Sequence, residues 1–239
     1  MDTLPTERDA FAWLLSEDSD LSVEEPKIAA AINEQLSHME LKSLDFESLR
    51  RIRDIAIRHN PKTIIEVGGG IGHLSAWLLD AFSSKSKFPK YTIVESGNKF
   101  AAILLRLTQR FDASEWANIS AMSFQELAAE CNAWLISNKT SLNSDSKEAI
   151  NPPAAIPTDL IIIDVGDEEQ VECIQSAFPL LSKNGLLLTI EPNVPFEGAS
   201  EKEADLFQSW MDLIRDIQEN IRIGFVPLEK TTLVAFMSK

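Results

Sequence analysis

The sequence has very few cysteines: Cys131 and Cys173 are the only two among 239 residues. They lie too far apart in sequence to form a CxxC metal site, and two cysteines do not make a disulfide framework. Free cysteine behaves as a small hydrophobic residue in protein cores. We therefore expect two buried, reduced thiols.

Basic residues and long apolar runs are also scarce. Lys and Arg number 22 against 37 Asp and Glu, so the formal net charge is −15 and the pI is near 4.6. This acidic balance argues against nucleic acid and anionic lipid as partners, because both attract basic surfaces. No apolar run approaches the ~20 residues that span a bilayer, and the first residues lack the basic and apolar regions of a signal peptide. We expect a cytoplasmic protein that binds neither nucleic acid nor membranes.

The remaining composition is that of a globular protein, with 44% hydrophobic and 25% charged residues. The first 60 residues predict helices, and Asp45 is a candidate N-cap for one of them. After them, β-branched runs alternate with helical segments, which predicts βαβ units and a parallel sheet. The last two strands, 222–227 and 231–236, are joined by a turn so short that they can pair only antiparallel.

The predicted fold class is therefore α/β. We expect a Rossmann-like, doubly wound, seven-stranded sheet made of five parallel strands and a C-terminal antiparallel hairpin. Residues 1–60 would form an N-terminal helical cover over the ligand cleft, and residues 61–239 the domain built on the sheet. Residues 137–157, rich in Ser, Thr, Asn and Pro, predict a flexible loop without regular structure.

The most specific motif is the glycine-rich run from Glu66 to Gly72, which follows a predicted strand and precedes a helix. Glycines allow the backbone to approach a ligand closely, and a helix N-terminus offers free N–H groups. A dinucleotide site would need a further glycine where His73 stands. The Glu66 carboxylate would repel a pyrophosphate and would favour a ligand that carries an amine.

Together with Glu95 at the end of the next strand, this motif resembles that of class I S-adenosylmethionine (SAM)-dependent methyltransferases, over roughly residues 40–239. The resemblance implies that the acid and glycines hold the amino-acid end of SAM and that Glu95 binds the ribose. A carboxylate suits that role because it can accept hydrogen bonds from both ribose hydroxyls. The expected cofactor-binding residues are Glu66, Gly68, Gly70, Gly72, His73, Glu95, Ser96, Ser123, Phe124 and Asp164.

Within that class, the chain resembles the small catechol/caffeoyl-CoA-type O-methyltransferases in length, in its helical N-terminal extension and in its C-terminal hairpin. The resemblance implies methyl transfer to an oxygen of a small molecule, with Mg²⁺ as a cofactor and a homodimer as the assembly. Asp164 matches the family's first metal ligand, but Asp167 stands in place of its general-base lysine, and Glu191-Pro192 replaces an Asp-Asn pair.

Two sets of residues follow for the chemistry of the acceptor. Asp164, Asp167 and Glu191 are the candidates for accepting the acceptor's proton. Asp164, Glu191 and Asn193 are the candidate oxygen ligands of Mg²⁺, although the altered motif does not predict a complete metal site.

Three other functions remain open. A catalytically silent SAM-binding or partner-binding domain would explain the missing lysine and Pro192. An aminopropyltransferase of the spermidine-synthase type would suit the acidic composition, but that family begins with a β-hairpin domain rather than with helices. An NAD(P)-linked oxidoreductase fails on the glycine spacing. The sequence does not name the methyl acceptor.

Overall fold

The computed structural model describes residues 7–18, 20–140, 151–196 and 198–239. No helix within these ranges is long and apolar enough to cross a membrane. In chain order the elements are α1 (Glu7–Leu15), α2 (Lys27–His38), α3 (Phe46–His59), β1 (Thr63–Val67), α4 (His73–Ser83), β2 (Lys90–Val94), α5 (Asn98–Arg110), β3 (Ala117–Ser120), α6 (Phe124–Thr140), β4 (Thr158–Ile163), α7 (Asp167–Ala177), a short 3₁₀ helix η2 (Phe178–Leu180), β5 (Leu181–Ile190), α8 (Glu201–Ile217), β6 (Ile221–Pro227) and β7 (Thr232–Ser238).

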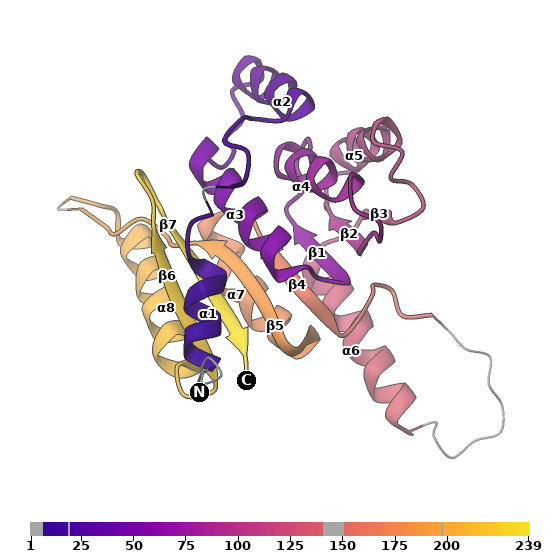
Figure 1. Ribbon diagram of the computed structural model, residues 1–239. Coiled ribbons are helices and arrows are strands. Elements are labelled where there is room, and N and C mark those ends of the chain that lie inside the picture. Colours follow the sequence, from indigo (N-terminus) through magenta and orange to yellow (C-terminus); the bar gives the residue numbers. More distant parts are fainter. Residues whose placement is uncertain (1–6, 19, 141–150, 197) are drawn as a thin grey trace, which may run out of the picture.

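The strands form one seven-stranded sheet in the order β3-β2-β1-β4-β5-β7-β6, with helices on both faces (Figure 1). Neighbouring strands from β3 to β5 are parallel, whereas β7 pairs antiparallel with both β5 and β6. The predicted fold class is confirmed. The strand order reverses between β1 and β4, and open α/β sheets bind their ligands in the crevice beyond the carboxyl ends of the strands at such a point.

Residues of each strand alternate between two buried cores. In β4, Leu160 and Ile162 belong to the core shared with α1 to α5, while Ile161 and Ile163 belong to the core shared with α6, α7 and α8. Because both faces are covered, the strand is apolar at consecutive positions instead of alternating with polar residues. The two cysteines are free and buried in the second core, as expected.

Local signals account for where several helices begin. The Asp45 side chain accepts a hydrogen bond from the Ser48 amide at 3.0 Å and caps α3, which confirms the predicted N-cap. Ser200 and Glu203 form a reciprocal capping box that starts α8. Such caps satisfy backbone N–H groups that have no partner inside a helix.

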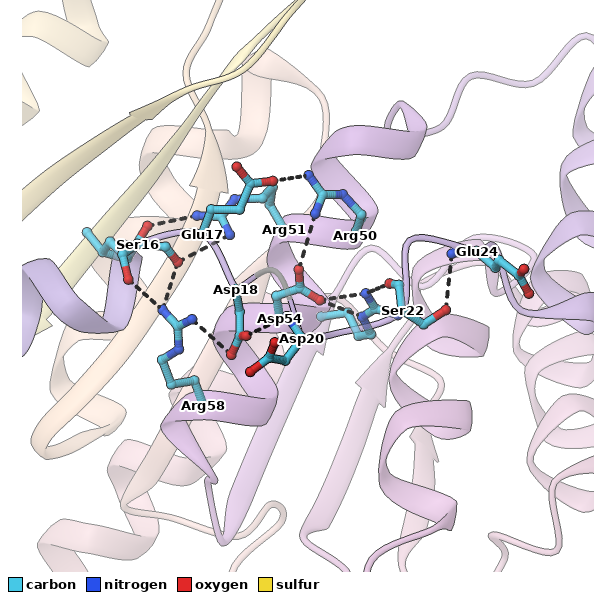
Figure 2. A network of polar contacts seen from close by, with 12 residues as sticks. Ser16, Glu17, Asp18, Asp20, Ser22, Glu24, Arg50, Arg51, Asp54 and Arg58 are labelled. Atoms are coloured by element: carbon cyan, nitrogen blue, oxygen red, sulfur yellow. Dashed lines mark hydrogen bonds and ion pairs between the residues drawn. The ribbon is translucent and has the colours of Figure 1, made fainter.

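Arginines on α3 hold the segment that links α1 to α2 (Figure 2). Arg58 lies 3.1 Å from Asp18, and Arg50 contacts both Glu17 at 2.8 Å and Asp54 at 3.6 Å. Burial raises the pKa of Asp54, and its arginine neighbours oppose that rise. This network attaches the N-terminal segment to α3, while α1 packs beside β6 and α2 beside α4.

The predicted loop at 137–157 differs in part from the structure. The helix α6 continues to Thr140, so residues 137–140 are helical and not a loop. Residues 141–150 lie outside the described ranges. Residues 151–157 form a loop that leads into β4. The serine and asparagine content of 137–140 was outweighed by continuation of the α6 hydrogen-bonding pattern, since helix propensity is a weak preference.

Candidate functional site

The glycine loop begins directly after β1, at the point where the strand order reverses. Gly68, Gly70 and Gly72 all have positive φ, at 90°, 52° and 94°. A Cβ added to Gly68 would lie 1.9 Å from the carbonyl oxygen of Asp164, which follows β4. Only glycine fits here, because the loops after the two strands touch through their backbones.

Gly72 serves a different purpose from the two glycines before it. It is the N-cap of α4, and a Cβ on it would lie 2.4 Å from Leu107 of α5. By contrast, nothing lies within 4 Å of a Cβ built on Gly70. The loop is therefore packed closely on both sides of Gly70 and open above it.

Two cavities meet at Gly68. A small one of about 60 Å³ lies between the ends of β1, β2 and β3 and the helices α6 and α7. A larger one of about 520 Å³ extends from the glycine loop to the segments after α2, β4 and β5. Both are lined by Gly68 and Val165, so they form two sides of one crevice.

Glu95 joins the end of β2 to the glycine loop. Its Oε2 accepts a hydrogen bond from the Gly70 amide at 2.8 Å, and its Oε1 accepts one from the Gly97 amide at 2.7 Å. The carboxylate lines the small cavity. Each carboxylate oxygen can accept more than one hydrogen bond, so Glu95 retains capacity for a ligand's hydroxyl groups.

Ser96, Ser123 and Phe124 also line the small cavity, so the structure brings these predicted residues together with Glu95. Ser123 at the same time forms a reciprocal pair with Glu126 at the start of α6, through distances of 2.8 to 3.2 Å. Phe124 is buried in the core beneath α6. Both residues therefore have structural roles in addition to lining the cavity.

Glu66 does not face either cavity. Its carboxylate is fully buried and accepts hydrogen bonds from Ser75 Oγ at 2.7 Å and from the Tyr91 hydroxyl. Burial raises the pKa of Glu66 to about 7; the nearby carboxylates of Asp164 and Glu95 add to the rise, and the two hydrogen bonds oppose it. The expectation of a ligand-facing acid is replaced by a buried link between β1, β2 and α4.

A pH-dependent stability follows from the buried Glu66 carboxyl. The folded protein keeps this proton up to about pH 7, whereas the unfolded chain loses it near pH 4.5. The free energy of unfolding should therefore fall by about 3 kcal/mol from this group as the pH rises between those values, and change no further above them. We expect Glu66→Gln to remove that slope and to be more stable relative to wild type at pH 8 than at pH 5.

Urea unfolding of both proteins at pH 5, 6, 7 and 8 tests this prediction. Other acids with raised pKa values, such as Asp164, are present in both proteins, so the difference isolates Glu66. Glu130→Gln, an exposed change on α6, is the control and should leave the profile unaltered. Parallel profiles for wild type and Glu66→Gln would contradict the raised pKa.

His73 lies at the first position of α4 and lines the large cavity. Its ring nitrogens are both engaged: Nδ1 lies 2.8 Å from Ser43 Oγ and Nε2 lies 3.0 Å from Glu25 Oε1. Glu25 precedes α2 and Ser43 follows it. His73 therefore ties both ends of α2 to the glycine loop, a role that sequence spacing did not indicate.

The large cavity contains only part of the predicted catalytic set. Asp164, Asp167 and Asn193 line it. Burial raises the pKa of Asp164 to about 6. Glu191 lines neither cavity, and its backbone amide donates to the Thr232 carbonyl at 2.8 Å as β5 meets β7. Glu191 therefore does not line the cavity with Asp164, Asp167 and Asn193, and its catalytic role stays a prediction.

Known structures share the fold of this chain, although no protein-family model and no curated protein matches it. A Staphylococcus aureus protein assigned as a caffeoyl-CoA O-methyltransferase aligns with a TM-score of 0.66 at 15% identity, covering 89% of this chain and 93% of the other. A Bacillus cereus O-methyltransferase in complex with SAH aligns at 0.65 and 13% identity, with 92% and 94% covered. The O-methyltransferase TomG of Streptomyces achromogenes, in complex with SAM, aligns at 0.64 and 12%, with 92% and 94% covered.

The chain has the class I SAM-dependent methyltransferase fold. At these identities the similarity establishes the fold, and the function has to be argued from the site. The fold expected from the glycine motif and the C-terminal hairpin is thereby confirmed.

The three oxygen ligands suggested for Mg²⁺ from the sequence do not all line the large cavity. Asp164 and Asn193 line the large cavity, but Glu191 does not, and Pro192 offers no side-chain oxygen. Within the described ranges there is no group of three or more His, Cys, Asp or Glu side chains that could hold a metal ion. We derive no step through Mg²⁺.

Several residues of the crevice were missed by the sequence reading. Val165, Glu169 and Cys173 bring the start of α7 to the small cavity. Lys42 and Ser43 bring the loop after α2 to the large one. That loop was expected only in general terms, as part of the helical cover. Its position depends on how α2 packs against α4, which the apolar spacing of α2 alone does not determine.

Proposed function

We propose that the chain is a SAM-dependent methyltransferase that transfers the methyl group to an oxygen of a small molecule. The observation that carries the proposal is the Glu95 carboxylate, which is hydrogen-bonded to the Gly70 amide and faces a cavity at the point where the strand order reverses. An acid at this place suits two vicinal hydroxyl groups such as those of a ribose.

The residues around the glycine loop fit SAM in their chemistry. The space above Gly70 would admit the amino-acid end of SAM, which would contact the backbone of the loop. Glu95 would hold the ribose hydroxyls, and Ser123 and Phe124 would lie beside the adenine. The small cavity has the volume of about two waters, so its side chains, such as Met122 and Gln125, would have to move to admit a purine.

The larger cavity offers what methyl transfer requires of the protein. SAM, when bound, supplies a methyl group already activated on a sulfonium. The chain's own contribution is to align the acceptor and to exclude water. Asp164 would accept the proton of the acceptor hydroxyl, since a carboxyl whose pKa is raised to about 6 is a stronger base than an ordinary aspartate and is still ionised at pH 7.

The similar structures support the cofactor, because two of them are described as complexes with SAH or SAM. They also support oxygen as the methylated atom, since all three reported above are named O-methyltransferases. The cytoplasmic location, the homodimer and the absence of a nucleic-acid partner stay predictions.

Calorimetric titration with S-adenosylhomocysteine tests the binding half of the proposal. We expect one site per chain, and the absence of binding would refute the proposal. Methylation of phenols, followed by mass spectrometry, tests the chemical half. Activity should be unchanged by EDTA, because Glu191 does not line the large cavity with Asp164 and Asn193. Loss of activity with EDTA and recovery with Mg²⁺ would contradict this. Binding without turnover of any acceptor would favour a silent SAM-binding domain.

A further inference from the structure

A third cavity continues the large one away from the glycine loop. It has a volume of about 290 Å³ and lies between the segment after β5 and the first turns of α8. Asp167 and Asn193 line both cavities. The large cavity and the third cavity are therefore contiguous at these residues. A molecule whose reacting end lies near Asp164 can extend into the third cavity.

The third cavity is largely apolar. Val194 and Phe196, which are 71% and 73% exposed, line it from the segment after β5, and Phe207 lines it from α8. Large exposed apolar side chains gathered at a cavity indicate a binding surface. Its acid Glu203 is engaged in the capping box with Ser200 and is not free to bind a ligand.

The junction of the large cavity and the third cavity is acidic. Within the described part of the chain, neither Asp164 nor Asp167 has an ion-pair partner, whereas the neighbouring Glu168 pairs with Lys202. Lys42 is the basic residue that lines the large cavity, and it comes from the loop after α2, beside Ser43. The whole chain carries a net charge of −15, which attracts cations and repels anions over longer distances.

We propose that the methyl acceptor is a hydroxyl compound that carries a cationic amine next to an apolar body. The amine lies against Asp167 at the junction, and the apolar body packs on Val194 and Phe196. This inference rests on the proposed methyl transfer and adds the charge and shape of the substrate. It makes Asp167 and Phe196 specificity-determining residues, in a position where the resemblance would place a general-base lysine.

Two probes of similar size and opposite charge test the proposal: tyramine and 3-(4-hydroxyphenyl)propionic acid. Their binding is measured by calorimetry on the protein saturated with S-adenosylhomocysteine, so no turnover is required. We expect the amine to bind about tenfold more tightly than the acid, because the exposed Asp167 carboxylate attracts the amine and repels the acid.

Matched variants assign the effect to the proposed residues. Asp167→Asn should reduce the preference for the amine severalfold, whereas Glu172→Gln, an exposed change of the same charge on the same helix, should leave it unchanged. Phe196→Ala should weaken both probes to a similar degree, because it removes apolar contact without changing the charge. Circular dichroism of each variant checks that it is folded.

The outcomes separate this proposal from the proposed function. Equal binding of the two probes, no binding of either, or an unchanged preference in Asp167→Asn would overturn the cationic acceptor. Formation of a methyl ether without a preference for the amine would keep methyl transfer and reject the cationic acceptor. A clear preference for the amine without any methyl ether would support the cationic site and count against methyl transfer.

Discussion

Replacing Gly68 by alanine is expected to destabilise the fold more than any other single change in the crevice. The new Cβ would lie 1.9 Å from the Asp164 carbonyl oxygen, well inside any contact distance, and the residue has a φ of 90°. The loops after β1 and β4 would have to separate. We expect a loss of about 4 kcal/mol in the free energy of unfolding and a Tm lowered by roughly 10 °C.

Gly70→Ala is the matched control for this prediction. Gly70 also has positive φ, at 52°, but a Cβ built on it meets nothing within 4 Å. The variant should lose only about 1 kcal/mol, the cost of a left-handed conformation for a residue with a side chain. It should still fold and bind S-adenosylhomocysteine less tightly, because the methyl group enters the space above the loop.

Differential scanning calorimetry and calorimetric titration of both variants distinguish the two effects. Equal losses of Tm would mean that backbone strain alone explains glycine at both positions. In that case the contact between the loops after β1 and β4 would not be what requires glycine at position 68.

Glu95→Ala is expected to have the largest effect on binding. The carboxylate would lose its hydrogen bonds to the ribose, and the Gly70 and Gly97 amides would lose the acceptor that holds them. Hydrogen bonds to a charged group contribute about 1.5–3 kcal/mol. The affinity for S-adenosylhomocysteine should therefore fall by roughly 100-fold.

Calorimetric titration measures this loss, and Glu130→Ala on the exposed face of α6 should bind as tightly as wild type. Adenine alone serves as a second ligand, since it lacks the ribose; its weaker binding should be affected less by Glu95→Ala. Unchanged affinity for S-adenosylhomocysteine in the Glu95 variant would refute the assignment of the ribose to this acid.

The sheet could be predicted from the sequence because each of its features is local. Consecutive apolar residues in 160–163 indicate a strand covered on both faces, and a turn too short for a crossover requires an antiparallel hairpin at the C-terminus. The confirmed cap of α3 at Asp45 is also local, since the side chain and the amide it accepts from lie three residues apart.

The crevice could be predicted only in part. The spacing from the glycine run to Glu95 is set by one βα unit, and the structure joins the two through the Gly70 amide. The orientation of Glu66 was missed, although the alternation of side chains along β1 could have predicted it. Glu66 faces the same side of the sheet as Ile64, toward the core beneath α4. The ligand role assigned to it overrode that alternation.

The sequence by itself determined the succession of strands and helices along the chain, the position of the glycine loop and the acid at the end of β2, because these depend on residues that are close in the chain. Tertiary structure alone decided that Gly68 touches Asp164, that Glu191 stays with β7 and that Asp167 joins two cavities. Those contacts unite segments far apart in sequence. They depend on how strands pair and how helices pack, and the spacing of neighbouring residues determines neither the pairing nor the packing.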